Sequence, residues 1–179
     1  MRTVVLASFL CFSSCLASGA ALAGDPAVPV REVMDATTTN WQEGDHEFQD
    51  LFDEPRLGRL YSKDFVEKYR AAAKFPAYDE GTSPFDYDVI VNGQDGCPLQ
   101  DTAIAVKGPK DGATEVDATF KNMSCAGTEP EYQKVSTVKF LVVEEGGKPV
   151  IDDILTENFD DGNFSSLKGI MVEIAKQGG

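Results

Sequence analysis

Hydrophobic and polar residues alternate through much of residues 84–155, and a period of two is typical of half-buried β-strands. Turn-forming residues cluster at 108–112 and again at Gly146-Gly147, so the stretch doubles back on itself. We therefore predict four antiparallel strands within about 85–155, arranged as a meander, with the first strand over 85–91.

The first tight hairpin is predicted to turn about Asp111. In that register Val116 faces Val106 on one side of the sheet. Glu115 then faces Lys107 on the other side. In this arrangement apolar side chains face apolar ones and charged side chains face charged ones. A slip of one residue would move every side chain to the wrong face.

The same register predicts a disulfide between Cys97 and Cys125. Both cysteines lie at the same sequence distance from Asp111, so extending the ladder places them opposite each other. Their Cα atoms then come within the separation that a disulfide needs. Two free buried thiols are the alternative.

The second hairpin is predicted to turn at Gly146-Gly147. This turn places Val142 opposite Ile151, and it places Phe140 opposite Asp153. Asp153 would thus lie on an apolar face, where a carboxylate must be hydrogen-bonded, paired or at the mouth of a pocket. It either caps a nearby backbone turn or serves as a pocket acid with a raised pKa.

Apolar residues recur at helical spacing on both sides of the strands. Helices are predicted within about 29–75, and a C-terminal helix over about 164–176. Ser62 fits the N-cap of one of these helices. Helices first, a meander second and a closing helix predict an α+β fold in which a four-stranded sheet packs on helices.

The first 23 residues have the pattern of a secretory signal peptide. Arg2 precedes a short apolar run, and Ala21-Leu22-Ala23 matches a small-x-small cleavage site. We therefore predict cleavage after Ala23 and a periplasmic or secreted protein. The mature chain, residues 24–179, is predicted to form a single domain.

Cys11 and Cys15 fall within this predicted signal peptide. The sequence around Cys15 loosely resembles a bacterial lipoprotein box but lacks its usual Leu, so we expect no lipid anchor there. Removal of the signal peptide leaves Cys97 and Cys125 as the only cysteines, and an oxidising compartment favours their pairing.

The formal net charge of the 179 residues is −14. Acidic residues spread along the chain argue against nucleic-acid and anionic-membrane binding, because both require a basic surface. No apolar run reaches the length of a membrane span. His46 is the only histidine, so we expect neither a histidine-based zinc site nor a catalytic triad, and no cofactor motif is present.

One family resemblance emerges from these motifs. The turn Asn92-Gly93-Gln94-Asp95 after an acidic, aromatic segment, followed by a meander ending in Val150-Ile151-Asp152-Asp153-Ile154, resembles an uncharacterised family of exported bacterial proteins, domain of unknown function 3828. That family is placed with the nuclear-transport-factor-2-like, or cystatin-like, folds. The resemblance implies a curved antiparallel sheet over helices with a cone-shaped cavity, and no established activity.

Three functions follow as hypotheses. We expect a non-enzymatic domain that binds a small ligand or a protein partner in a cavity between sheet and helices. One alternative is an enzyme that uses Asp153 for proton transfer or hydrolysis. Another is an inhibitor or immunity-type protein that offers its acidic surface to a basic target. The candidate binding residues are Trp41, Tyr69, Tyr87, Asp95, Phe140 and Asp153.

Overall fold

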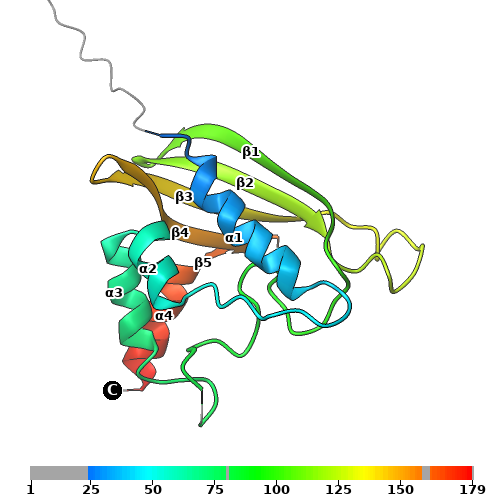
Figure 1. Cartoon of the computed structure of the whole chain (residues 1–179), viewed down its shortest axis with the longest axis horizontal. Helices are drawn as coiled ribbons and strands as arrows, with labels where there is room; N and C mark the ends of the chain where they lie inside the picture. Colours follow the sequence, from blue (N-terminus) through cyan, green and yellow to red (C-terminus); the bar gives the residue numbers. More distant parts are fainter. Residues whose placement is uncertain (1–23, 80, 159–161, 179) are drawn as a thin grey trace, which may run out of the picture.

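The computed structural model describes residues 24–79, 81–158 and 162–178. The predicted signal peptide, with its cleavage site and Cys15, lies outside the described residues. Within them the chain forms four helices and one five-stranded antiparallel sheet in the order β1-β2-β3-β4-β5 (Figure 1). The predicted α+β class is thus confirmed, with one more strand than expected.

Strands and helices are segregated along the chain. The helices are α1 (Ala27–Asn40), α2 (Glu54–Leu60), α3 (Lys63–Ala72) and α4 (Leu167–Gln177). The strands are β1 (Gln100–Lys110), β2 (Ala113–Lys121), β3 (Ser136–Glu145), β4 (Lys148–Glu157) and β5 (Phe164–Ser166). The closing helix begins later than predicted because β5 first pairs with β4.

One face of the sheet carries the core. Every second residue of β2 and β3 is buried, as the alternating sequence requires. Helix α1 contacts β1, β2 and β4, while α3 and α4 pack side by side against the end of the sheet at β4 (Figure 1). The largest fully buried side chains include Phe65, Phe120 and Phe140.

The predicted strand over 85–91 is wrong. This segment forms tight turns, closed by an isolated bridge between Asp88 and Gly93. The Asp88 carboxylate accepts hydrogen bonds from the backbone N–H groups of Ile90 and Val91, at 2.8 and 3.0 Å. Asn92 then adopts a left-handed conformation, with φ of 57°. Side-chain bonding to the local backbone therefore reverses the chain before a strand can pair.

The register of the first hairpin is confirmed at its centre, where Val106 pairs with Val116. A bulge at Lys107 then shifts the ladder, so Glu115 pairs with Gly108 and not with Lys107. The carboxylate of Glu115 forms its ion pairs elsewhere, with Lys110 at 2.5 Å among others.

The predicted register of the second hairpin is confirmed only near its turn. Val142 pairs with Ile151 as predicted, but a bulge follows, and Leu141 faces Asp153 while Phe140 faces Ile154. The predicted pairing of Phe140 with Asp153 is wrong for this reason. The extra residue in the bulge shifts the phase of β4 by one, so that Ile151 and Ile154 both lie in the core.

The disulfide between Cys97 and Cys125 is confirmed, with a Cα–Cα distance of 5.7 Å. Both cysteines lie beyond the ends of the paired strands, so loops bring them together rather than the ladder itself. The backbone N–H of Cys97 donates to the carbonyl of Asn122 at 2.6 Å, which holds the two loops in place.

Replacement of both cysteines, Cys97→Ser with Cys125→Ser, is expected to lower the free energy of unfolding by about 3.5 kcal/mol, because the closed loop constrains the unfolded chain. Urea unfolding monitored by circular dichroism measures the change. The wild-type protein unfolded in reductant serves as the control and should lose a similar amount. An unchanged midpoint in both would contradict the assignment.

Candidate functional site

A cleft of about 690 Å³ lies between the end of α1 and the loops that follow α1 and α3. We call it the aromatic cleft because six aromatic side chains line it: Trp41, Phe48, Phe52, Tyr78, Phe85 and Tyr87. No strand residue lines it. The cavity expected between sheet and helices is therefore not this one, and the cleft belongs to the connecting loops.

Asp88 organises one wall of the aromatic cleft. Its Oδ1 accepts the two backbone N–H groups of the turn described above, and its Oδ2 accepts the indole N–H of Trp41 at 2.9 Å. A carboxylate that accepts three hydrogen bonds is well satisfied in a partly buried position. The turn and the end of α1 are thereby joined through one side chain.

Asn40, the last residue of α1, fixes the loop that follows this helix. Its side-chain amide donates to the carbonyl of Gln49 at 2.8 Å, and its amide oxygen accepts the Gln49 N–H at 2.7 Å. This reciprocal pair closes the intervening loop. Phe48, next to Gln49, is thus held at the rim with 73% of its surface exposed.

The floor of the cleft continues into the aromatic part of the core. Phe52 packs against Tyr69 and Phe85, with ring centroids 4.8 and 5.9 Å apart, and Phe85 packs against Tyr87 at 6.0 Å. Burial raises the pKa of Tyr69 to about 12 and also raises the pKa of Tyr87. The Tyr69 ring stacks on Phe52, whereas the Tyr87 ring meets Phe85 edge to face, and both are favourable aromatic arrangements.

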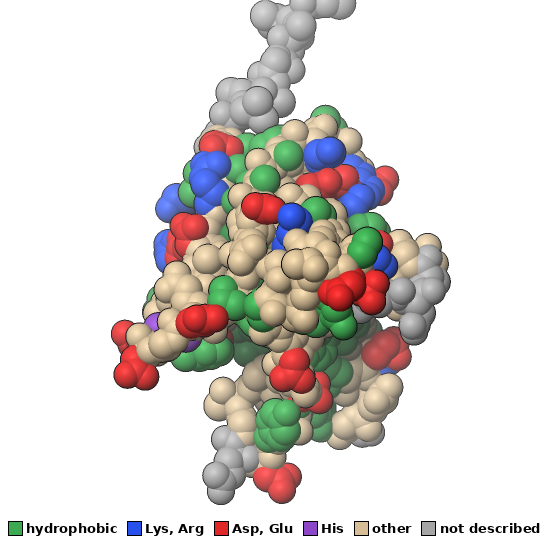
Figure 2. All heavy atoms as spheres, turned by 90° about the vertical axis from the view of Figure 1, so that its right-hand side faces the viewer, with side chains coloured by type: hydrophobic (Ala, Val, Ile, Leu, Met, Phe, Trp, Pro, Cys, Tyr) green, Lys and Arg blue, Asp and Glu red, His purple; other side chains and the backbone are tan. Residues whose placement is uncertain are grey.

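The charged residues that line the aromatic cleft in the described part of the chain are all acidic. They are Asp50, Asp86 and Asp88. Tyr78 at the rim is 62% exposed, so the cleft offers aromatic surface to solvent beside carboxylates. Figure 2 shows this character on one face of the molecule, where hydrophobic side chains gather in a hollow in the lower half and acidic side chains lie around them.

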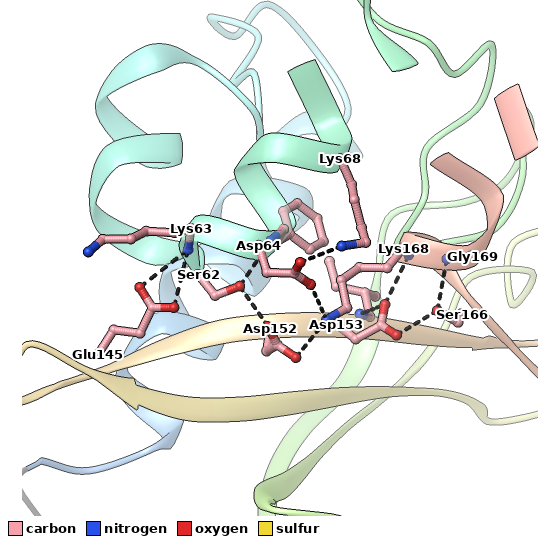
Figure 3. A network of polar contacts seen from close by, with 12 residues as sticks. Ser62, Lys63, Asp64, Lys68, Glu145, Asp152, Asp153, Ser166, Lys168 and Gly169 are labelled. Carbon is pink, nitrogen blue, oxygen red and sulfur yellow. Dashed lines mark hydrogen bonds and ion pairs between the residues drawn. The ribbon is translucent and has the colours of Figure 1, made fainter. Parts of the chain in front are cut away.

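Asp153 lies away from this cleft, at the start of α4 (Figure 3). Only 7% of its surface is exposed. Its Oδ1 accepts the backbone N–H groups of Ile154 and Lys168 at 2.9 and 3.0 Å, and its Oδ2 accepts the hydroxyl of Ser166 at 2.6 Å. These contacts match the structural alternative, a carboxylate that caps a nearby backbone turn.

The neighbouring Asp152 is bonded in a parallel way. Its Oδ1 accepts the hydroxyl of Ser62, the N-cap of α3, and its Oδ2 accepts the ammonium of Lys168, both at 2.7 Å (Figure 3). Lys168 also binds Asp64 at 2.9 Å. Burial lowers the pKa of Lys168, but its hydrogen bonds to Asp152 and Asp64 outweigh this and raise it overall, so the lysine stays charged.

The structure brings only part of the predicted site together. Trp41 and Tyr87 line the aromatic cleft, and Tyr69 lies behind its floor. Asp95 is exposed outside the lining, and Phe140 is fully buried in the core. Whether any of these residues binds a ligand stays a prediction.

Phe48 and Tyr78 escaped the sequence analysis. Both are aromatic residues isolated among polar and small neighbours in loops, and their position there is the signal that could have revealed them. Asp88 falls within the strand predicted over 85–91, and that prediction gave no indication of its bond to Trp41.

Metal ligands do not cluster in the part of the chain that the structure describes, where no three His, Cys, Asp or Glu side chains are arranged to hold an ion. His46 lies exposed, with its Nδ1 3.0 Å from the carbonyl of Gly44. None of the described helices has the length and apolarity that crossing a bilayer requires.

Comparison with known proteins gives no relative: no family model, no curated protein and no solved structure matches the chain. The resemblance to the exported bacterial family therefore stays a prediction.

Substitution of Asp153 by Ala is expected to lower the free energy of unfolding by about 2–3 kcal/mol, since it removes the acceptor of one buried backbone N–H, one partly buried backbone N–H and a hydroxyl. Asp153→Asn, which keeps an acceptor oxygen, should cost less. Urea unfolding provides the measurement. Asp95→Ala, an exposed acid, is the matched control, and equal effects of Asp153→Ala and Asp95→Ala would disprove the capping role.

Proposed function

We propose that the protein is a non-enzymatic binding domain whose aromatic cleft takes a cationic ligand with an apolar part. The observation that carries this proposal is the composition of the lining: among the described residues it has six aromatic side chains and three carboxylates but no Lys, Arg or His. Aromatic faces attract cations through the ring quadrupole, and carboxylates pair with them directly.

Other ligand classes fit this lining less well. A neutral apolar ligand would desolvate Asp50 and Asp86 without giving them a partner, which is costly. An anion would be repelled by the same carboxylates. A cation with an apolar body gains from both parts of the lining, and the exposed rings of Phe48 and Tyr78 could close over it.

The geometry supports binding over catalysis. Asp153, the acid on which the enzyme hypothesis rests, does not line the aromatic cleft, and its oxygens are occupied by the start of α4. A Lys or Arg side chain of a basic protein partner offers the same chemistry as a small organic cation, so the inhibitor hypothesis shares this site. The strongly negative net charge would attract either ligand over distance.

We further propose that the protein acts outside the cytoplasm. The disulfide supports this location, because such bonds persist in oxidising compartments. The N-terminal pattern that ends at Ala23 supports it from the sequence. Membership in the nuclear-transport-factor-2-like folds is part of the same proposal, supported by helices lying against an antiparallel sheet.

Benzyltrimethylammonium, a cation with an aromatic body, is the probe that tests the binding proposal. Trp41 is the only tryptophan and lies in the cleft wall, so its fluorescence reports occupancy directly. Titration should change this fluorescence saturably and raise the melting temperature. Benzyl alcohol, a neutral compound of similar shape, should produce a much weaker response.

Variants of the rim locate the binding. Phe48→Ala and Tyr78→Ala should each weaken the affinity for the probe about two- to fivefold through loss of ring contacts. Phe164→Ala removes a partly exposed ring outside the cleft and should leave the affinity unchanged. Equal binding of the cation and the alcohol, or equal effects of all three variants, would refute the proposal.

A further inference from the structure

Most Lys and Arg side chains in the described part of this acidic protein form an ion pair with a carboxylate. The sequence has 16 Lys and Arg, and all except Arg2 lie in the described residues, which leaves 15. Eleven of these form ion pairs within 4.0 Å. In the described part of the chain, the four without an ion pair are Lys63, Lys74, Lys134 and Lys148.

Three of these four lysines line a single pocket. It has a volume of about 1060 Å³ and lies between α2, α3 and the turn that joins β3 to β4. We call it the basic pocket. Lys63, Lys74 and Lys148 contribute to its lining, while Lys134 does not.

Within the described residues, the other charged side chains of the basic pocket form no ion pair with these three lysines. Arg59 and Arg70 also line it, but their guanidinium groups pair with Glu32 and Glu54, which lie outside the lining. Of its two acids, Glu145 is held by the backbone N–H of Lys63, 3.3 Å from each carboxylate oxygen. Its other acid, Glu67, has no ion pair within the described residues.

The three lysines of the basic pocket come from separate parts of the fold. Lys63 begins α3 directly after its Ser62 cap, and its ammonium points away from the carboxylates of Asp64 and Asp152 (Figure 3). Lys148 is the first residue of β4, after the Gly146-Gly147 turn, and Lys74 follows the end of α3. The two ends of one helix and one hairpin therefore each contribute an exposed lysine without an ion pair to the lining of one pocket.

Such an arrangement favours an anion of more than one charge. Glu67 and Glu145 also line the pocket, but in the described part of the chain neither forms an ion pair with Lys63, Lys74 or Lys148. The ammonium group is a compact point charge with three N–H donors, and lysine is a common ligand of phosphate oxygens. The two arginines of the pocket are already occupied.

We propose that the basic pocket binds a phosphate-bearing, multiply charged anion, held mainly by Lys63, Lys74 and Lys148. The shared chemistry covers both a free polyphosphate and the phosphate headgroup of a lipid. The proposal goes beyond the function assigned to the aromatic cleft. The two sites share no lining residue and prefer ligands of opposite charge, so either can fail without the other.

Isothermal titration of the purified protein with inorganic pyrophosphate tests the site. We expect saturable binding that weakens as sodium chloride is added. Lys63→Ala, Lys74→Ala and Lys148→Ala should each reduce the affinity about two- to fivefold, and the triple variant on the order of tenfold. Lys134→Ala is the matched control, because it removes one unpaired lysine outside the pocket and should leave the affinity unchanged.

A second arm distinguishes the source of the phosphate. Sedimentation with phosphatidylcholine vesicles that contain phosphatidylglycerol, against pure phosphatidylcholine, reports headgroup binding, and the same variants apply. Binding in either arm that depends on the three pocket lysines supports the proposal. Absence of binding in both arms would overturn it, and so would equal losses in Lys134→Ala and the pocket variants.

Discussion

Two adjacent carboxylates on β4, those of Asp152 and Asp153, hold α3 and α4 to the sheet. Asp152 accepts the hydroxyl of Ser62, which caps α3, and Asp153 accepts the hydroxyl of Ser166, which caps α4. Each helix therefore begins with a serine whose oxygen accepts from the helix backbone and whose proton goes to β4. Because both helices start at one point of one strand, α3 and α4 are brought side by side.

The bulge in β4 makes this arrangement possible. Without it, strict alternation would place either Ile151 or Ile154 outside the core, but both are fully buried. The extra residue lets the two carboxylates lie between the two isoleucines while the helices cover them. Lys168 then spans from Asp152 to Asp64 of α3, so one ammonium group pairs with a carboxylate of the sheet and a carboxylate of the helix.

The sequence predicted only part of the register of each hairpin. Val142–Ile151 was correct because it lies on the turn side of the bulge in its hairpin, and a glycine turn determines which residues face each other nearby. Val106–Val116 was also correct, but it lies beyond the bulge at Lys107, and the pairing predicted on the turn side of that bulge was wrong. A bulge depends on what packs against the strand, here the helices over β4, and no local sequence pattern predicts it. The disulfide was predicted correctly because loops tolerate the errors of register that the strands do not.

The aromatic cleft shows the same limit for a binding site. The alternation at 85–91 favoured a strand, whose acids would point to solvent, yet the short-range bonds of Asp88 make a turn instead. Trp41 and Tyr87 could be chosen as candidates from residue type alone. Their position beside Phe48 and Tyr78 could not be predicted from the sequence. It depends on two loops that are closed by side chains, Asn40 in one loop and Asp88 in the other. A site built from loops is thus determined by the few polar contacts that close them.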